Sequence, residues 1–268
     1  MKTGRISVVH SLIVLWTAAI VIFLYIPIVS VVLASFSRKR YFSFPITQWT
    51  TKWYEKAMTS LSVRDLIETS LSVAVLVTIF SVVLAFFGSL AFARYEWKGR
   101  KLYQKIILLP IFFPQAVLGL ALLLWFSAIG VITSWQTAVF AHMVWIVPIV
   151  TLIMSIQVYS FDPALEEAAY DLGASRWQVL REITLPILFP GILSGAIFAF
   201  LLSWGNFPLS MFTTGADSTV PEWLYAKMVS GYTPMVPTLG ALTVVSAIIM
   251  LMLAFLVHAI IRRRTLKE

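Results

Sequence analysis

The sequence predicts an all-α, polytopic integral membrane protein with about six transmembrane helices. Of its 268 residues, 60% are hydrophobic and 12% are charged, and the mean hydropathy is +0.90. Soluble domains carry about 25% charged residues, so this composition excludes a soluble globular domain. The apolar residues gather into six long runs, which indicates membrane spans joined by polar loops. No polar stretch is long enough to form a separate core, so we expect a single transmembrane domain over residues 1–268.

Each apolar run is long enough to cross the hydrocarbon core as a helix, which takes roughly 20 residues. The first run is longer than the apolar core of a signal peptide, so we expect an uncleaved span there. Pro27 lies in this run, where a proline can kink the helix, and Pro110 and Pro114 lie near the start of the third run. The predicted spans cover about residues 9–35, 67–92, 106–129, 137–158, 187–211 and 237–261.

The least hydrophobic region, residues 36–66, follows the first span. Its Phe44-Pro45 pair and the stretch after Trp49 predict an extended lead followed by a short interfacial helix. Aromatic side chains are frequent here, as they are at membrane surfaces. These aromatic residues are Tyr41, Phe42, Phe44, Trp49, Trp53 and Tyr54.

The charge distribution predicts the orientation in the membrane. The net charge of +8 favours basic residues set against anionic headgroups rather than nucleic acid. Six spans place both termini on one side, and that side carries 13 of the 20 basic residues against seven on the other. The positive-inside rule therefore predicts cytoplasmic termini. Arg38, Lys39 and Arg40 oppose this assignment, whereas Arg262, Arg263 and Arg264 support it.

One stretch, the charged loop of residues 162–186, separates the fourth predicted span from the fifth. It holds five of the twelve acidic residues, so it must lie in water, on the side of the termini. Apolar residues within it recur at i, i+3, i+4 and i+7, which makes one narrow stripe on a helix. The acidic residues are Asp162, Glu166, Glu167, Asp171 and Glu182, and the stripe is Leu165, Ala168, Ala169 and Leu172.

The charged loop predicts two short helices with a break between them. Asp162 is a good N-cap, and Pro163 suits the first helical position. Gly173 ends the first helix, because glycine readily adopts a positive φ. Ser175 and Gln178 fit a capping box that starts the second helix. A helix-turn-helix with a small apolar face and an acidic rim is suited to dock into a groove on a partner.

Seven residues of the charged loop stand at fixed offsets: Glu167, Ala168, Ala169, Gly173, Ile183, Leu185 and Pro186. Their pattern resembles the signature EAA-x3-G-x9-I-x-LP, which marks the membrane-spanning subunits of binding-protein-dependent ABC importers. The chain also resembles, over most of its length, the second permease subunit of spermidine/putrescine-type importers. A solvated hairpin that merely joins two spans is the alternative, and it would explain the charge but not the spacing.

The resemblance implies a bacterial inner-membrane subunit that pairs with a second, homologous permease. The pair would sit on two ATPase subunits, which bind ATP and Mg, and would receive a small-molecule substrate from a periplasmic binding protein. This chain would bind no cofactor and catalyse no reaction. The charged loop would couple it to the ATPase through Glu166, Glu167, Ala168, Ala169, Asp171, Gly173, Ala174, Ser175, Ile183, Leu185 and Pro186.

The residues in the spans agree with an external energy source. The spans hold almost no charge, no metal-ligand spacing and no phosphate-binding glycine loop. With no cysteine, disulfides, thiol catalysis and cysteine metal sites are excluded. A secondary transporter would need a buried ionisable pair at mid-membrane, which we do not find. A membrane assembly subunit that transports nothing is the other alternative, and co-purification without an ATPase would favour it.

Four polar or aromatic residues are candidates for the substrate pathway. Trp204 and Asn206 lie in a polar, glycine-containing run of the fifth predicted span, where an amide is costly in lipid unless it faces a cavity or another helix. A helix-packing seam through Gly205 is the alternative. Gln115 is a further candidate in the third span. His142 in the fourth is either a pathway ligand or a packed side chain near the interface.

The candidate residues leave the substrate open. A polyamine or another amine-bearing metabolite is favoured by the resemblance, followed by an opine, a phosphonate or a sugar-like solute. Polyamine permeases of this type tend to carry acidic residues in the run that corresponds to residues 203–208. This chain has none there, so nothing in that run offsets the desolvation of several ammonium groups.

Overall fold

The structure is a computed structural model that describes residues 8–41 and 44–265. Within these residues the chain forms helices, and the only strand-like pairing is one β-bridge between Ser37 and Trp49. The predicted all-α class is therefore confirmed. Lys2, Arg5 and Lys267, which enter the basic-residue count, and Phe42 of the aromatic region lie outside the described residues.

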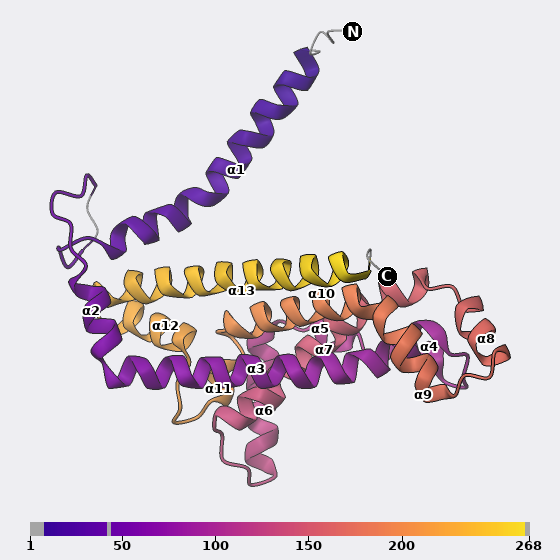
Figure 1. Cartoon of the computed structure of the whole chain (residues 1–268). Coiled ribbons are helices and arrows are strands. Elements are labelled where there is room, and N and C mark those ends of the chain that lie inside the picture. Colours follow the sequence, from indigo (N-terminus) through magenta and orange to yellow (C-terminus); the bar gives the residue numbers. More distant parts are fainter. Residues whose placement is uncertain (1–7, 42–43, 266–268) are drawn as a thin grey trace. The chain divides into compact units, whose positions relative to one another are not determined.

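The helices follow one another along the chain, most of them with short connections (Figure 1). They are α1 (Val8–Ser35), α2 (Lys52–Thr59), α3 (Leu61–Ser89), the π-helix η1 (Leu90–Arg94), α4 (Arg100–Ile106), α5 (Leu109–Phe112), α6 (Gln115–Ala128), α7 (Trp135–Ser160), α8 (Ala164–Asp171), α9 (Arg176–Val179), the π-helix η2 (Leu180–Thr184), α10 (Leu185–Trp204), α11 (Ser210–Thr213), α12 (Val220–Ser230) and α13 (Met235–Thr265).

Five of the six predicted spans coincide with continuous helical segments that are long and apolar enough to cross a membrane. The third differs, because Arg100–Phe112 and Gln115–Ala128 are bent by 103° at the break between them. The break falls at Pro114, which lacks an N–H and holds Phe113 in an extended conformation, with ψ 136°. The continuous segments are Val9–Ser35, Leu61–Arg94, Trp135–Ser160, Arg176–Trp204 and Met235–Val257.

The fifth span also ends earlier than predicted. The expected helix reached residue 211, whereas α10 ends at Trp204 and a short turn of helix, α11, begins at Ser210. Gly205 caps α10, and the Asn206 side chain accepts the Leu209 N–H at 3.0 Å. The part of the polar run from Gly205 onward therefore forms a turn after the helix.

The chain divides into two compact units, residues 1–64 with 224–246 and residues 65–223 with 247–268. In the first unit, α1 is exposed along its most apolar stretch. The predicted short helix is present as α2, which packs against the end of α1. Ser35 Oγ lies 2.6 Å from the Tyr54 hydroxyl, and Trp53 Nε1 donates to Ser37 O at 3.1 Å.

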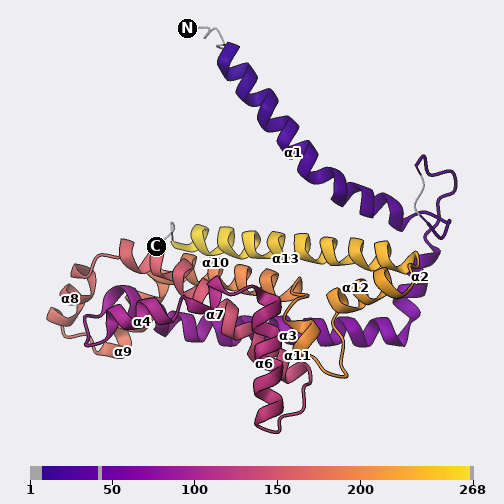
Figure 2. The same cartoon turned by 180° about the vertical axis from the view of Figure 1, so that it is seen from behind.

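The core of the second unit lies between α3, α7 and α10. Helices α7 and α10 lie side by side, as Figures 1 and 2 both show. Their close approach depends on small residues: a Cβ added at Gly195 would lie 2.9 Å from both Val150 Cγ1 and Met154 Cε. Helices α4, α8 and α9 gather at one end of this unit in both views, and α8 and α9 belong to the charged loop.

Candidate functional site

The charged loop folds as the predicted helix-turn-helix. Helix α8 begins at Ala164, one residue later than predicted, and its first turn is capped by Asp162, whose Oδ1 accepts the Ala164 N–H at 3.0 Å. Glu166 and Glu167 lie in this first turn, at the positive end of the helix dipole. Local capping therefore defines where the helix starts.

The turn between α8 and α9 is built from two capping motifs. Gly173 has φ +88°, and the N–H groups of Gly173 and Ala174 donate back to Tyr170 O and Ala169 O at 2.9 and 3.0 Å. Ser175 and Gln178 then form the predicted capping box, with Ser175 N–H donating to Gln178 Oε1 at 2.8 Å. Both predictions for this turn are confirmed.

Several large apolar side chains of the charged loop are exposed on its surface. The exposed fraction is 50% for Leu165, 89% for Leu172 and 66% for Trp177. Ala168 is exposed and Ala169 is half-buried. Large apolar side chains exposed together outside the membrane indicate an interaction surface.

Opposite this face, a carboxylate clamp fixes α8 to the rest of the unit. The clamp consists of Arg94, Glu166 and Thr184. Arg94 Nη2 donates to Glu166 Oε2 at 2.6 Å, and Thr184 Oγ1 donates to Glu166 Oε1 at 2.5 Å. The side chains of Arg94 and Glu166 are only 13% and 17% exposed. A charge pair at this depth is screened less by salt than a surface pair.

The clamp also includes the end of α7. The Arg94 guanidinium lies 4.9 Å from the ring centroid of Phe161 and donates to Phe161 O at 3.4 Å. Arg94 ends η1, Phe161 follows α7, Glu166 lies in α8 and Thr184 ends η2. A movement of α8 would therefore act on η1, α7 and η2 together. Sequence reasoning missed Arg94 and Thr184, because Arg94 lies outside the signature and Thr184 occupies its variable position between Ile183 and Leu185.

The last part of the signature leads into the membrane. Leu180, Ile183 and Leu185 pack against the core cluster of the second unit. Residues 180–184 form a π-helix, which agrees with Pro186, because this proline offers no N–H to the carbonyl of Glu182. A groove of about 310 Å³ between η1 and the charged loop includes Tyr95, Glu166, Tyr170, Arg176 and Thr184 in its lining.

The four predicted pathway residues lie together in a different part of the second unit. His142, Asn206 and Trp204 are 0%, 4% and 8% exposed, and Gln115 is half-buried. We define the interior polar cluster as Gln115, His142, Ser203, Asn206 and Ser210. Trp204 stacks on Phe200, with the ring centroids 5.9 Å apart.

Hydrogen bonds determine the tautomer of His142. Ser210 Oγ donates to Asn206 O at 2.8 Å, so its oxygen accepts from His142 Nε2–H at 3.0 Å. His142 Nδ1 then accepts the hydroxyl proton of Ser203 at 2.9 Å. This chain of bonds ties α7 to the end of α10 and the start of α11. In this structure both ring nitrogens of the histidine have hydrogen-bond partners, and the side chain is fully buried.

Asn206 holds the turn after α10 and contacts α6. Its Oδ1 accepts from Leu209 N–H, and its Nδ2 donates to Gln115 Oε1 at 3.3 Å. A Cβ added at Gly119 of α6 would lie 3.0 Å from Phe212 Cδ2, so α6 packs closely on this turn. Substrate contact by Trp204, Asn206, Gln115 and His142 stays a prediction. Among residues 8–41 and 44–265, no three His, Asp or Glu side chains group as metal ligands would.

Comparison with known proteins gives the family. The model of the family "Binding-protein-dependent transport system inner membrane component" matches residues 85–267. The match covers more than half of the chain, so the chain belongs to this family. It is a permease subunit of an ABC importer and an inner-membrane protein. Such subunits are not enzymes, and ATP hydrolysis lies in separate subunits.

Two relatives and one solved structure refine this placement. The spermidine/putrescine transport system permease protein PotC of Escherichia coli (strain K12) is 29% identical over 240 residues, 89% of this chain and 90% of the relative. The putrescine transport system permease protein PotI of the same strain is 28% identical over 228 residues, 82% and 81% of the two chains. A chain from a bacterial ABC transporter involved in the import of the acidic polysaccharide alginate has a TM-score of 0.69 at 18% identity and covers 97% of this chain and 96% of its own. At that identity the likeness shows the fold alone.

Proposed function

We propose that the charged loop is the surface through which an ATPase subunit moves this permease. The observation that carries the proposal is that the charged loop has an exposed apolar face and is at the same time fixed to the rest of the unit through Glu166. Leu172 and Trp177 are exposed on the outer side of the loop, while Glu166 is held by Arg94 and Thr184 on the inner side. A surface that is rigidly attached to the spans can both bind a partner and transmit its movement.

The assembly that we propose is the one that membership of the family implies. The chain pairs with a second, homologous permease, the two rest on two ATPase subunits, and a periplasmic binding protein delivers the substrate. ATP and Mg bind to the ATPases and not to this chain. Closure of the ATPase dimer brings the two docked loops together and opens the pathway outward. Hydrolysis and phosphate release return it to the inward-facing state.

This assignment requires the charged loop and both termini to lie in the cytoplasm, in agreement with the 13 to 7 distribution of basic residues. The chain has no cysteine, so single cysteines report on sidedness directly. A Tyr170→Cys variant should react with an impermeant thiol reagent only after the cells are permeabilised. An Ile132→Cys variant should react in intact cells. Reaction of the cysteine at position 170 from outside would contradict the orientation.

The substrate class we propose is a polyamine or a related amine-bearing metabolite. The support is the likeness to two permeases that are named for spermidine and putrescine transport. The carboxylates of Asp217 and Glu222, which follow α11, could in principle bind a cationic substrate, but both already accept hydrogen bonds within the chain. Asp217 accepts the Trp135 N–H at 2.9 Å, and Glu222 accepts from Thr214 Oγ1 and Thr219 N–H. In the assembly, binding-protein selectivity and the partner permease would supply the acidic contacts.

The test of docking uses two leucine-sized side chains of equal exposure. Leu172 and Ile132 are both 89% exposed, in the charged loop and in the turn after α6 respectively. We expect Leu172→Glu to reduce co-purification of the ATPase and uptake of labelled spermidine, because a carboxylate would have to be buried at the contact. Ile132→Glu should leave ATPase co-purification unchanged. Equal ATPase recovery with both variants would overturn the proposal.

A further inference from the structure

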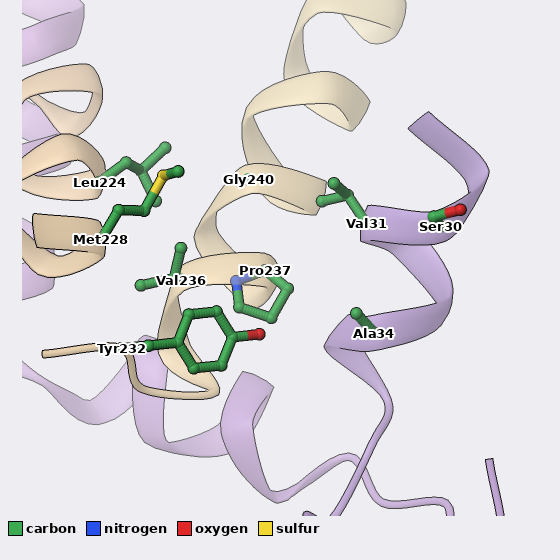
Figure 3. A pocket seen from close by; sticks show the side chains of 9 residues that line it. All are labelled: Ser30, Val31, Ala34, Leu224, Met228, Tyr232, Val236, Pro237 and Gly240. Atoms are coloured by element: carbon green, nitrogen blue, oxygen red, sulfur yellow. The ribbon is translucent and has the colours of Figure 1, made fainter. Parts of the chain in front are cut away.

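An apolar pocket lies within the first unit, between α1, α12 and the start of α13 (Figure 3). Its volume is about 480 Å³, within the usual range of small-molecule sites. Figure 3 shows Leu224 and Met228 on one side, Val31 on the other, and the ring of Tyr232 at one end. The full lining is Ser30, Val31, Ala34, Leu224, Met228, Tyr232, Val236, Pro237 and Gly240.

The lining suits a hydrocarbon occupant. It contains no charged side chain, and its polar side chains are Ser30 and Tyr232. The Ser30 hydroxyl donates to Ile26 O in its own helix at 2.8 Å, so it does not need an occupant as a partner. The Tyr232 phenol remains an O–H donor at the edge of the pocket, and burial raises its pKa. A polar solute would lose its hydration here without replacement.

Exposed aromatic side chains lie at one end of the pocket. Tyr41 stacks on Tyr232, with the ring centroids 5.9 Å apart, and Tyr41 and Trp49 are 63% and 60% exposed. Exposed tyrosine and tryptophan at the end of a span are typical of the headgroup region. One end of the pocket therefore lies where lipid headgroups lie.

Three consecutive basic residues lie at this same end. Arg38, Lys39 and Arg40 are exposed, and Arg40 Nε donates to Tyr232 O at 3.4 Å. Within the described ranges, no carboxylate forms an ion pair with any of the three. They are also the residues that oppose the positive-inside distribution. A negative charge from outside the chain would account for their position beside an apolar pocket.

We propose that the pocket binds an anionic phospholipid. One acyl chain fills the space between α1, α12 and α13, and the headgroup phosphate lies against Arg38, Lys39 and Arg40. The Tyr232 hydroxyl donates to an ester or phosphate oxygen at the mouth. In the proposed orientation this lipid belongs to the periplasmic leaflet. The site is independent of the docking role proposed for the charged loop.

The experiment measures lipid retained by the complete permease complex. The delipidated complex is incubated with phosphatidylglycerol or with phosphatidylcholine of the same acyl chains, and bound lipid is counted by native mass spectrometry. We expect preferential retention of phosphatidylglycerol. An Arg38→Gln/Arg40→Gln variant should weaken it by about fivefold for each charge removed. The matched control is Lys52→Gln/Lys56→Gln, which removes two exposed charges from α2 and should have no effect.

A second pair of variants tests the acyl-chain pocket without changing charge. Met228→Trp fills the pocket from α12 and should prevent retention of the lipid, whereas Val229→Trp changes an exposed neighbour outside the lining and should not. Equal retention of the two lipids, or retention unaffected by Met228→Trp, would overturn the proposal. Unchanged phosphatidylglycerol retention with weaker binding-protein association in the arginine variant would assign the basic residues to an acidic protein surface instead.

Discussion

The charged loop and the interior polar cluster are both held by hydrogen bonds between polar side chains. The loop has an exposed apolar surface, whereas most of the cluster is buried. In the charged loop, Thr184 and, from η1, Arg94 hold the Glu166 carboxylate, while large apolar side chains of the loop stay exposed. In the interior polar cluster, His142 forms its hydrogen bonds with the buried residues Ser203 and Ser210, and no part of His142 is exposed. The first arrangement leaves a surface for another chain. The second closes the break between α10 and α11, so its loss should act on stability before it acts on coupling.

We expect the largest effect on uptake from an aspartate substitution at Gly173. The same substitution at Gly130, which has a similar backbone conformation, distinguishes a loss of docking from a loss of folding. Gly173 and Gly130 both have left-handed φ values, +88° and +73°, and a Cβ at either would meet nothing within 4 Å. An aspartate at either position therefore costs a similar amount, on the order of 1 kcal/mol. We expect Gly173→Asp to lower uptake by roughly tenfold or more, because the apolar face rotates away from its partner. Gly130→Asp should retain ATPase binding.

The measurement is ATPase pull-down and substrate uptake, both normalised to inserted permease. Normal ATPase recovery and uptake with Gly173→Asp would remove the docking role from the turn. Glu167→Lys should have a smaller effect, because it reverses a charge at the exposed rim without changing the backbone.

The two regions also differ in how well the sequence predicts them. The caps of the charged loop join residues two to five positions apart, and Asp162, Gly173 and Ser175 carried enough local information to predict them. The bonds of His142 join residues 61 and 68 positions apart, and the Arg94 to Glu166 pair spans 72. Periodicity and capping rules contain no information on such pairs. The spans were predictable because, like the caps, they depend on residues close together in the sequence. The third span is the exception, because the helix breaks at Pro114.

The second prediction concerns stability of the interior polar cluster. His142→Leu leaves the hydroxyls of Ser203 and Ser210 without their shared partner in a buried site, which costs about 1–3 kcal/mol. We expect a lower thermal midpoint of the purified complex and less assembled complex, with ATPase bound per permease unchanged. His142→Gln keeps a donor and an acceptor and should lose less. A His142→Leu complex of normal stability that fails to bind ATPase would contradict the distinction between the two regions.

The third prediction tests whether the carboxylate clamp acts as a unit. Arg94→Gln and Glu166→Gln should each weaken stimulation of ATPase activity by the loaded binding protein several-fold, and the double variant should be no worse than either alone. The reason is that each single variant leaves a half-buried charge or its partner unpaired. Glu96→Gln removes the exposed partner of the i,i+4 pair with Arg100 and should have little effect, because Arg100 keeps its hydrogen bonds to Phe92 O and Ala93 O. Strictly additive losses would show that Arg94 and Glu166 act separately.

The smallest expected effect distinguishes the two roles of Asn206. An Asn206→Asp substitution keeps the oxygen that accepts from Leu209 N–H but removes the amide that donates to Gln115. Asn206→Ala removes both. If Asn206 only caps the turn, the aspartate variant should transport with an unchanged KM and the alanine variant should lose assembled complex.

If Asn206 instead lines the pathway when the pore opens, the added carboxylate should lower the KM for spermidine by a few-fold, because an opposite charge offsets the desolvation of an ammonium group. We expect the second result, because an amide in this run is costly in lipid unless it faces a cavity or another helix. The comparison is uptake of spermidine and of a neutral competitor per assembled complex. If the wild type, Asn206→Asp and Asn206→Ala all have the same KM for spermidine, then Asn206 only stabilises the turn. Other residues, for example in the partner permease, would then contact the substrate.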